Sequence, residues 1–227
     1  MIYFTGDTHG DLGRFSQPGM RKLKKGDTLI ICGDFGFLWD GSKVEKSILK
    51  KLGKKSYNVC FVDGAHENFE LLQEYPVAEW NGGKVHQLGG RLFHLMRGQI
   101  YTIEGKTIFA MGGGVSPDEE FRSEDENRMH WQIPSREELR AATAALEAVN
   151  GQVDYIVTHE PPLRIKAFLQ LKQHDSNKDL TGLNTYFEEI GKCCRFERWF
   201  FGSMHLDKRI ASTHICLFRK IIPANEA

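Results

Sequence analysis

The sequence lacks several features that would place it in a specialised class of protein. Lys+Arg and Asp+Glu both number 30, so there is no basic excess of the kind that nucleic-acid and membrane-surface binders usually carry. No apolar run reaches the ~18 residues of a membrane span. The five cysteines include no C-x-x-C pair, and no signal peptide precedes the first apolar segment. We therefore expect a cytoplasmic protein with no membrane partner and no strong nucleic-acid signature.

Internal repeats, low-complexity stretches and Pro/Ser-rich linkers are also missing. A chain of 227 residues is long enough to bury its own core without disulfides or a structural metal. Hydrophobic residues at 41% and charged residues at 26% are ordinary for a globular protein. The sequence thus predicts one domain over residues 1–227.

The N-terminal part alternates strand and helix patterns. Apolar runs at 2–5, 28–32 and 57–62 predict buried strands, and 42–52 and 67–75 predict helices, the first with Ser42 as its cap and Val44, Ile48, Leu49 and Leu52 on one face. Short strands then follow, separated by glycine-containing pairs, and this spacing predicts an antiparallel meander. These strands are 85–88, 91–96, 100–103 and 106–111.

A long polar loop at 112–133 separates this region from the last part of the chain, and loops of that length are often functional. After it, the patterns predict helices at 134–149, 163–171 and 183–194, and strands at 153–158, 198–201, 209–212 and 215–218. Two packed sheets between layers of helices would bury these apolar strands on both faces, which is an α/β architecture.

Glycine, aspartate and histidine gather where predicted strands end. The segments are T-G-D-T-H-G at 5–10, C-G-D-F-G at 32–36, D-G-A-H-E at 63–67, T-H-E-P-P at 158–162 and F-G-S-M-H at 201–205. Each alone is better explained by a turn or a helix cap than by a functional site. Together they predict one site, because ligands of α/β sheets bind at the carboxyl ends of the strands. Two carboxylates with several imidazoles suit a divalent transition metal. The candidates are Asp7, His9, Asp34, His66, His159 and His205.

These segments resemble the signature of the calcineurin-like metallophosphoesterase superfamily, which runs D-x-H, G-D, G-N-H-[E/D], a lone His and G-H-x-H. The resemblance implies a small, single-domain, bacterial-type member with a four-layer αββα sandwich of two mixed β-sheets. It also implies a dinuclear centre of Mn, Fe or Zn ions that hydrolyses a phosphomonoester or phosphodiester. The substrate would be a phosphorylated small molecule or a nucleotide.

The resemblance also implies a role for each matching residue. Asp7, His9 and His205 would hold the first metal, and Asp34 would bridge to a second one bound by His159. His66 would donate a proton to the leaving oxygen. Arg122 is a candidate for stabilising charge on the phosphoryl oxygens, with an ordinary surface arginine as an equal alternative.

Two positions depart from the signature. Ala65 stands where the family has Asn, and Ser203 stands where it has the first His of the last motif. In the family, both missing ligands belong to the second metal. The intact family site would hold two ions, whereas we expect one ion in this chain. We therefore expect strongly impaired hydrolysis. An engineered double substitution is favoured over natural decay because the flanking residues are intact. A weak second site completed by Ser203 or water is a third reading.

A non-catalytic binding or scaffold protein with this fold is the alternative function. Retention of all the residues of the first site favours the hydrolase. The other histidines follow no strand-end glycine and are interpreted as structural or surface residues; they are His86, His94, His130, His174 and His214. The sequence indicates no particular substrate, metal or oligomeric state.

Overall fold

The computed structural model describes residues 1–115, 131–173 and 180–226. The strands are β1 (Ile2–Thr5), β2 (Thr28–Cys32), β3 (Asn58–Val62), β4 (Val77–Trp80), β5 (Gly83–Gly89), β6 (Leu92–Leu95), β7 (Gln99–Ile103), β8 (Lys106–Met111), β9 (Tyr155–Thr158), β10 (Arg198–Phe201), β11 (Lys208–Ile210), β12 (His214–Cys216) and β13 (Ile222–Pro223). The α-helices are α1 (Pro18–Arg21), α2 (Lys43–Gly53), α3 (Phe69–Gln73), α5 (Arg136–Ala148), α6 (Leu163–Gln173) and α7 (Gly182–Cys193), with 3₁₀ turns at Leu12–Ser16 and Ala224–Glu226.

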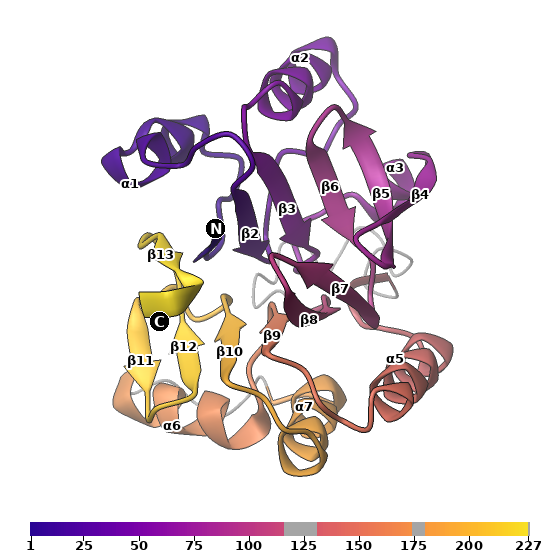
Figure 1. Ribbon diagram of the computed structural model, residues 1–227, viewed down its shortest axis with the longest axis vertical. Coiled ribbons are helices and arrows are strands. Elements are labelled where there is room, and N and C mark those ends of the chain that lie inside the picture. Colours follow the sequence, from indigo (N-terminus) through magenta and orange to yellow (C-terminus); the bar gives the residue numbers. More distant parts are fainter. Residues whose placement is uncertain (116–130, 174–179, 227) are drawn as a thin grey trace.

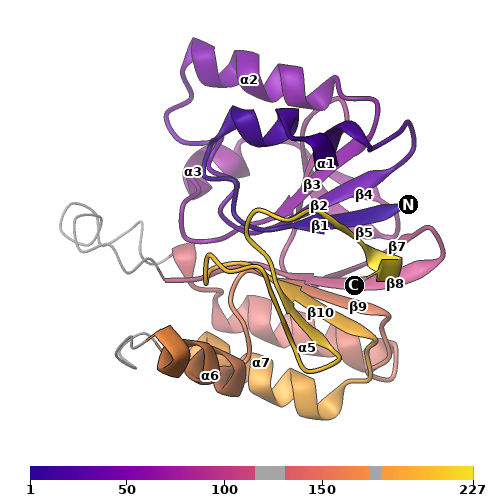
Figure 2. The same cartoon turned by 90° about the vertical axis from the view of Figure 1, so that its left-hand side faces the viewer.

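These strands form two mixed sheets that pack face to face (Figure 1). The first has the order β13-β1-β2-β3-β6-β5-β4, with β1, β2, β3 and β6 paired in parallel. The second has the order β11-β12-β10-β9-β8-β7, with β8, β9, β10 and β12 paired in parallel. Helices α1, α2 and α3 cover the outer face of the first sheet, and α5, α6 and α7 cover the second (Figure 2). The predicted αββα sandwich is confirmed.

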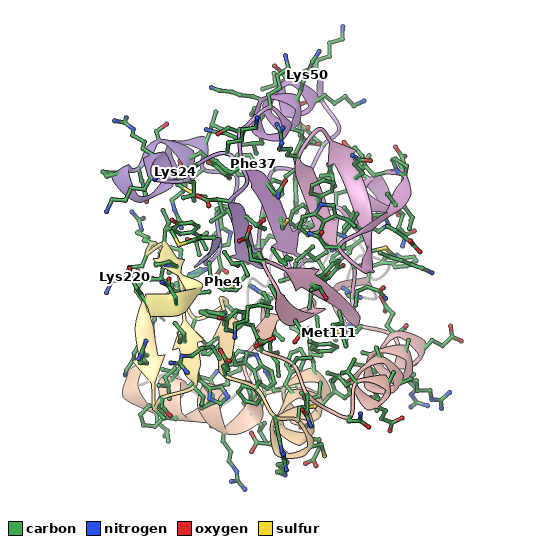
Figure 3. The ribbon with its side chains drawn as sticks, in the orientation of Figure 1. Phe4, Lys24, Phe37, Lys50, Met111 and Lys220 are labelled. Atoms are coloured by element: carbon green, nitrogen blue, oxygen red, sulfur yellow. The ribbon has the colours of Figure 1, made fainter. Side chains whose placement is uncertain are left out.

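Apolar residues fill all three interfaces of this sandwich. Between the sheets, Phe4 of β1 stacks on Phe200 of β10 with ring centroids 3.7 Å apart, and both side chains are fully buried. Figure 3 shows Phe4 at the centre of the molecule, whereas Lys50 extends outward from α2. Strand β2 reads T-L-I-I-C and is buried along its whole length, as expected for a strand covered on both faces.

Helix ends follow the sequence signals. The Ser42 hydroxyl accepts from Glu45 N and caps α2, as predicted. Ser135 and Glu138 form a capping box that starts α5. The predicted apolar face of α2 is wrong at Val44, which is 70% exposed, because this position lies in the first turn and faces away from the sheet.

The predicted antiparallel meander is wrong. Strand β5 pairs antiparallel with β6, and β7 with β8, but β6 and β7 belong to different sheets. Strand β6 pairs in parallel with β3 on its other side, which satisfies a second row of backbone hydrogen bonds for a fully buried strand. Helix α1 and strands β4 and β13 were not predicted; β4 and β13 are edge strands of the first sheet.

The parallel strands of each sheet bring their carboxyl ends to a common edge. Thr5, Cys32 and Val62 end neighbouring strands of the first sheet, and Thr158 and Phe201 end neighbouring strands of the second. The five sequence motifs therefore meet where the two sheets face each other. Among the described residues, no helix has the length and apolar character needed to cross a membrane.

Candidate metal centre

The turns after β1 and β2 are joined by backbone hydrogen bonds. Thr8 N and His9 N both donate to the carbonyl oxygen of Asp34, at 3.0 and 2.9 Å. His9 and Asp34 take positive φ angles of 45° and 44°. Histidine and aspartate adopt this left-handed conformation more readily than bulkier residues. The pairing places the side chains of the D-x-H and G-D motifs side by side.

Two strand-end glycines allow the motifs to close on the carboxylates. A Cβ atom at Gly64 would overlap Oδ1 of Asp34, and one at Gly202 would overlap Oδ1 of Asp7. Backbone from the third and fifth motifs thus rests directly against the two buried aspartates, which a side chain at either glycine would prevent.

The side chains predicted from the motifs come together in three overlapping groups, each with ligand atoms within 4.8 Å of one another. The groups are Asp7, His9 and His205; His9, Asp34 and His66; and Asp7, Asp34 and His159. In the first group, His205 Nε2 lies 3.3 Å from Asp7 Oδ2 and 2.9 Å from His9 Nε2. In the last, His159 reaches both aspartates, with Nδ1 3.6 Å from Asp7 Oδ1 and Nε2 3.6 Å from Asp34 Oδ1.

Asp34 is the central acceptor of the third motif. Its Oδ1 accepts from Ala65 N at 2.7 Å and His66 N at 3.0 Å, and its Oδ2 lies 2.8 Å from His66 Nδ1. This carboxylate therefore fixes both the backbone after β3 and the orientation of the His66 ring.

Burial and neighbouring charges shift the pKa values of Asp34 and His159 in opposite directions. Burial raises the pKa of Asp34, but the imidazoles of His159, His66 and His9 outweigh it and lower that pKa below its usual range. Burial lowers the pKa of His159, but Asp34 and Asp7 outweigh it and raise that pKa well above its usual value. In the metal-free chain, protons on the imidazoles thus balance two nearly inaccessible negative charges.

The Oδ2 atom of Asp7 indicates whether the site suits a cation. Asp7 is fully buried, and its Oδ2 has no hydrogen-bond partner among the described residues. An unpaired buried carboxylate oxygen is costly and calls for an explanation. With the nitrogens of His205 and His9 next to it, the donor set is one carboxylate and two imidazoles, which fits a first-row divalent ion.

The two departures from the motif lie inside this cluster. Ala65 is 6% exposed and contributes its backbone N–H to Asp34. Ser203 has φ 54°, donates its backbone N–H to Asp7 Oδ1 at 3.3 Å, and buries a hydroxyl with no partner among the described residues. Neither side chain supplies the amide or imidazole that the family signature has at these places.

A family model for calcineurin-like phosphoesterases matches residues 1–207 of this chain. The chain belongs to the calcineurin-like phosphoesterase family. Membership supports metal-dependent hydrolysis of phosphoesters as the general activity, in a family whose site is dinuclear and holds divalent metals. No curated protein matches the chain. Among solved structures, it is similar to a protein of unknown function from Aquifex aeolicus at 15% identity, covering 84% of this chain and 92% of that one, with a TM-score of 0.35.

Sequence reasoning missed two residues that support this candidate site. Arg14 is buried and donates to Asp7 O at 2.9 Å, to Thr5 Oγ1 at 3.0 Å and to Phe218 O at 2.5 Å. Glu67 accepts from Phe35 N and Gly64 N, which joins the second motif to the third. Burial, followed by the charge of Asp34, raises the pKa of Glu67 to about 8. Only the E of D-G-A-H-E marked Glu67, and no pattern marked Arg14.

Three predicted or interpreted positions lie outside the described residues: Arg122, His130 and His174. The loop predicted at 112–133 is described only at its two ends. His214 is half-buried on β12 and stacks on Trp199, away from the motif residues, which agrees with a structural role.

Proposed function

We propose that this chain is a metal-dependent phosphoesterase with one well-furnished cation position, formed by Asp7, His9 and His205. The Oδ2 atom of Asp7 carries the proposal, because it is buried beside two imidazole nitrogens and has no hydrogen-bond partner among the described residues. Mn, Fe and Zn are the candidate ions, and a phosphorylated small molecule or nucleotide is the candidate substrate class.

A bound divalent ion would supply positive charge to the phosphoryl oxygens of the substrate. Asp34 holds the His66 ring through Nδ1, and we assign His66 Nε2 to protonation of the leaving oxygen. The side chain of His66 is 22% exposed, so a substrate can reach it from solvent. Arg122 remains our candidate for balancing charge on the phosphoryl group.

Hydrolysis by this chain should be strongly impaired. Asp34 and His159 alone remain of the four ligands that the family signature gives to the second metal, because Ala65 and Ser203 replace the other two. Too few ligands would weaken binding of the second ion, and the phosphoryl group would then be held from one side only.

A non-catalytic binding protein is the second candidate function, and Ala65 and Ser203 are the observations that favour it. The two functions differ in metal content. A scaffold should purify with almost no transition metal and gain none on titration with Mn²⁺. The proposed enzyme should bind about one Mn²⁺ per chain, because the donor set at Asp7 is complete.

Restoring the two ligands tests the proposal. We expect an Ala65→Asn, Ser203→His version to bind a second Mn²⁺ and to cleave bis-p-nitrophenyl phosphate faster than the present chain. The gain should exceed the roughly 10–100-fold that loss of an outer hydrogen-bond partner of a metal ligand costs. An Ala211→Asn change serves as the control, because Ala211 is exposed near β11. Equal rates for the present and restored chains would contradict the proposed impairment, and no cleavage by either would contradict the enzyme.

A further inference from the structure

A second polar cluster lies beside the metal centre, on the same edge of the first sheet. It lines a cavity of about 240 Å³ between α3, the end of β6 and the start of α5. The walls that matter here are Phe69, His86, Met96, Arg97 and Glu138, with Asp63 at the back. Trp131 and Ile133, which also line it, are 41% and 43% exposed, so the cavity opens to solvent.

This cavity is one residue away from the candidate metal centre. Asp63 lines it, and the next residue, Gly64, rests against the Asp34 carboxylate. Adjacent Cα atoms are about 3.8 Å apart. The segment 112–114 runs between the two places, since a Cβ at Gly112 would overlap Asp63 and one at Gly114 would press on the His159 ring. The cavity and the candidate metal centre are therefore neighbours, separated by the turn at 112–114.

A chain of hydrogen bonds sets the proton positions on two buried histidines. His94 Nε2 lies 3.0 Å from Asp63 Oδ1, and His86 Nδ1 lies 2.9 Å from His94 Nδ1. Asp63 also accepts from Arg97, whose Nε and Nη2 donate to its Oδ2 at 2.9 and 2.7 Å. Because the Asp63 carboxylate only accepts, His94 Nε2 carries the hydrogen of this contact, and in the tautomer with one ring proton His94 Nδ1 is an acceptor.

The hydrogen-bond chain also makes Nε2 of His86 a hydrogen-bond acceptor. Because His86 Nδ1–H donates to His94, its Nε2 carries a lone pair, and that atom has no partner among the described residues. Burial, and then the proximity of His94, lowers the pKa of His86 to about 4, so the ring is neutral near pH 7. His86 is 8% exposed and lines the cavity.

The guanidinium of Arg97, the positively charged group in the cavity, has most of its N–H donors already engaged. Besides binding Asp63, Arg97 directs Nη1 to Glu138 at 3.3 Å and Nη2 to the carbonyl oxygen of Trp131 at 2.8 Å. Glu138 has a side chain that is 40% exposed, and its carboxylate can accept further bonds. The described walls thus present two acceptors, His86 Nε2 and the partly exposed carboxylate of Glu138, next to the ring of Phe69.

We propose that this cavity recognises the organic part of the phosphoester, and that it selects a neutral planar ring bearing N–H donors over an anionic ring. The inference rests on the proposed function, since it supplies the substrate class for that site. The volume suits a single ring rather than a whole substrate, because an engineered cavity of about 150 Å³ accommodates benzene.

Benzamide and benzoate are matched probes for the first test, because they share a shape and differ in donors and charge. We expect the present chain to bind benzamide about three- to tenfold more tightly than benzoate, the range of one net hydrogen bond. In His86→Phe, which keeps a flat ring and removes the acceptor, this ratio should fall to about one. Ligand-observed NMR measures both affinities without any turnover.

Two further variants keep the test decisive if His86→Phe misfolds. Met96→Phe fills the cavity without touching the histidine pair and should weaken benzamide binding. Gln87→Phe adds the same ring at an exposed neighbouring position of β5 and should change nothing. Equal binding of the two probes, preference for benzoate, or no saturable binding of either would overturn the inference.

A second test connects the cavity to catalysis. In the Ala65→Asn, Ser203→His version with Mn²⁺, His86→Phe should lower kcat/KM for 4-carbamoylphenyl phosphate about three- to tenfold and leave 4-carboxyphenyl phosphate unchanged. Comparing each ester with itself removes leaving-group effects. Equal effects on both esters would overturn the substrate role of the cavity while the proposed hydrolysis stands. Selective benzamide binding with no cleavage of any ester would instead overturn the proposed function and support the cavity alone.

Discussion

His9 Nε2 and His205 Nε2 lie 2.9 Å apart, although 196 positions separate the two residues in the chain. Two neutral imidazole nitrogens at this distance must share a proton, or both lone pairs must point at a common cation. Asp7 Oδ2 lies 3.3 Å from the same nitrogen of His205 and lacks a hydrogen-bond partner in the described structure. The carboxylate makes a cation the better solution, because it adds a third ligand to the pair.

Removal of one of these imidazoles should release the metal. We expect His205→Ala to weaken Mn²⁺ binding by at least about tenfold, since loss of an outer partner of a ligand already costs 10–100-fold. Isothermal titration calorimetry on chelator-treated protein measures the affinity. His214→Ala is the matched control, because it removes a histidine of the same sheet region that stacks on Trp199. Equal losses in the two variants would argue against a metal position at Asp7.

The strand ends were predictable because their signals are local. A short apolar run followed by glycine and a polar residue marks both the strand and its turn, and the parallel β-α-β order then brings the turns together. The pairing of β6 was not predictable in this way. Strand β6 could pair with β7 through the short connection between them, or with β3 across the sheet, and only the packing of the two sheets decides for β3.

The supporting residues of the site were hidden for a related reason. Arg14 follows the D-x-H motif by a few positions and follows no strand-end glycine, yet it reaches Phe218 from the far end of the chain. The ion pair of Asp63 and Arg97 joins residues 34 positions apart. Contacts of this kind depend on tertiary structure and leave no periodic pattern in a single sequence.

Arg14 should be irreplaceable by lysine. Its guanidinium donates to three oxygens, on Thr5, Asp7 and Phe218, and a single ammonium group cannot match that planar arrangement. We expect Arg14→Lys to lower the free energy of unfolding by about 1–3 kcal/mol, because buried acceptors lose their donors. Urea denaturation of the metal-free chain measures this, with Arg21→Lys, at an exposed position of α1, as the control. A change no larger than that of the control would mean that the three bonds contribute little.

Asp63 should make the stability of the chain depend on acid. Burial raises the pKa of Asp63, but Arg97 and His94 outweigh it and lower that pKa below its ordinary value of 3.8. A lowered folded pKa means that the carboxylate stabilises the fold above about pH 4 and that this contribution is lost as the pH falls through the folded pKa. Asp63→Asn should therefore cost about 3–5 kcal/mol at pH 7, the usual cost of breaking a buried ion pair.

The pH dependence distinguishes this effect from simple loss of packing. The difference in unfolding free energy between the present chain and Asp63→Asn should shrink as the pH is lowered below about 4. Glu189→Gln is the control, because Glu189 pairs with Lys192 on the exposed surface of α7 and should change stability by less than about 1 kcal/mol at any pH. A difference that stays constant between pH 7 and pH 3 would refute the electrostatic explanation.

A methyl group added at Gly64 should disturb the metal centre strongly. A Cβ there would overlap both the carboxylate and the backbone nitrogen of Asp34, so either the turn after β3 or the aspartate must move. We expect Gly64→Ala to destabilise the fold by about 1–3 kcal/mol, as overpacking usually does, and to weaken Mn²⁺ binding at least about tenfold.

Gly182→Ala is the matched control, since Gly182 starts α7 with no described atom within 4 Å of an added Cβ. Alanine there should be neutral or stabilising by up to about 1 kcal/mol. If Gly64→Ala bound Mn²⁺ as tightly as Gly182→Ala, Asp34 would not need its observed position, and its assignment as a shared ligand would be lost.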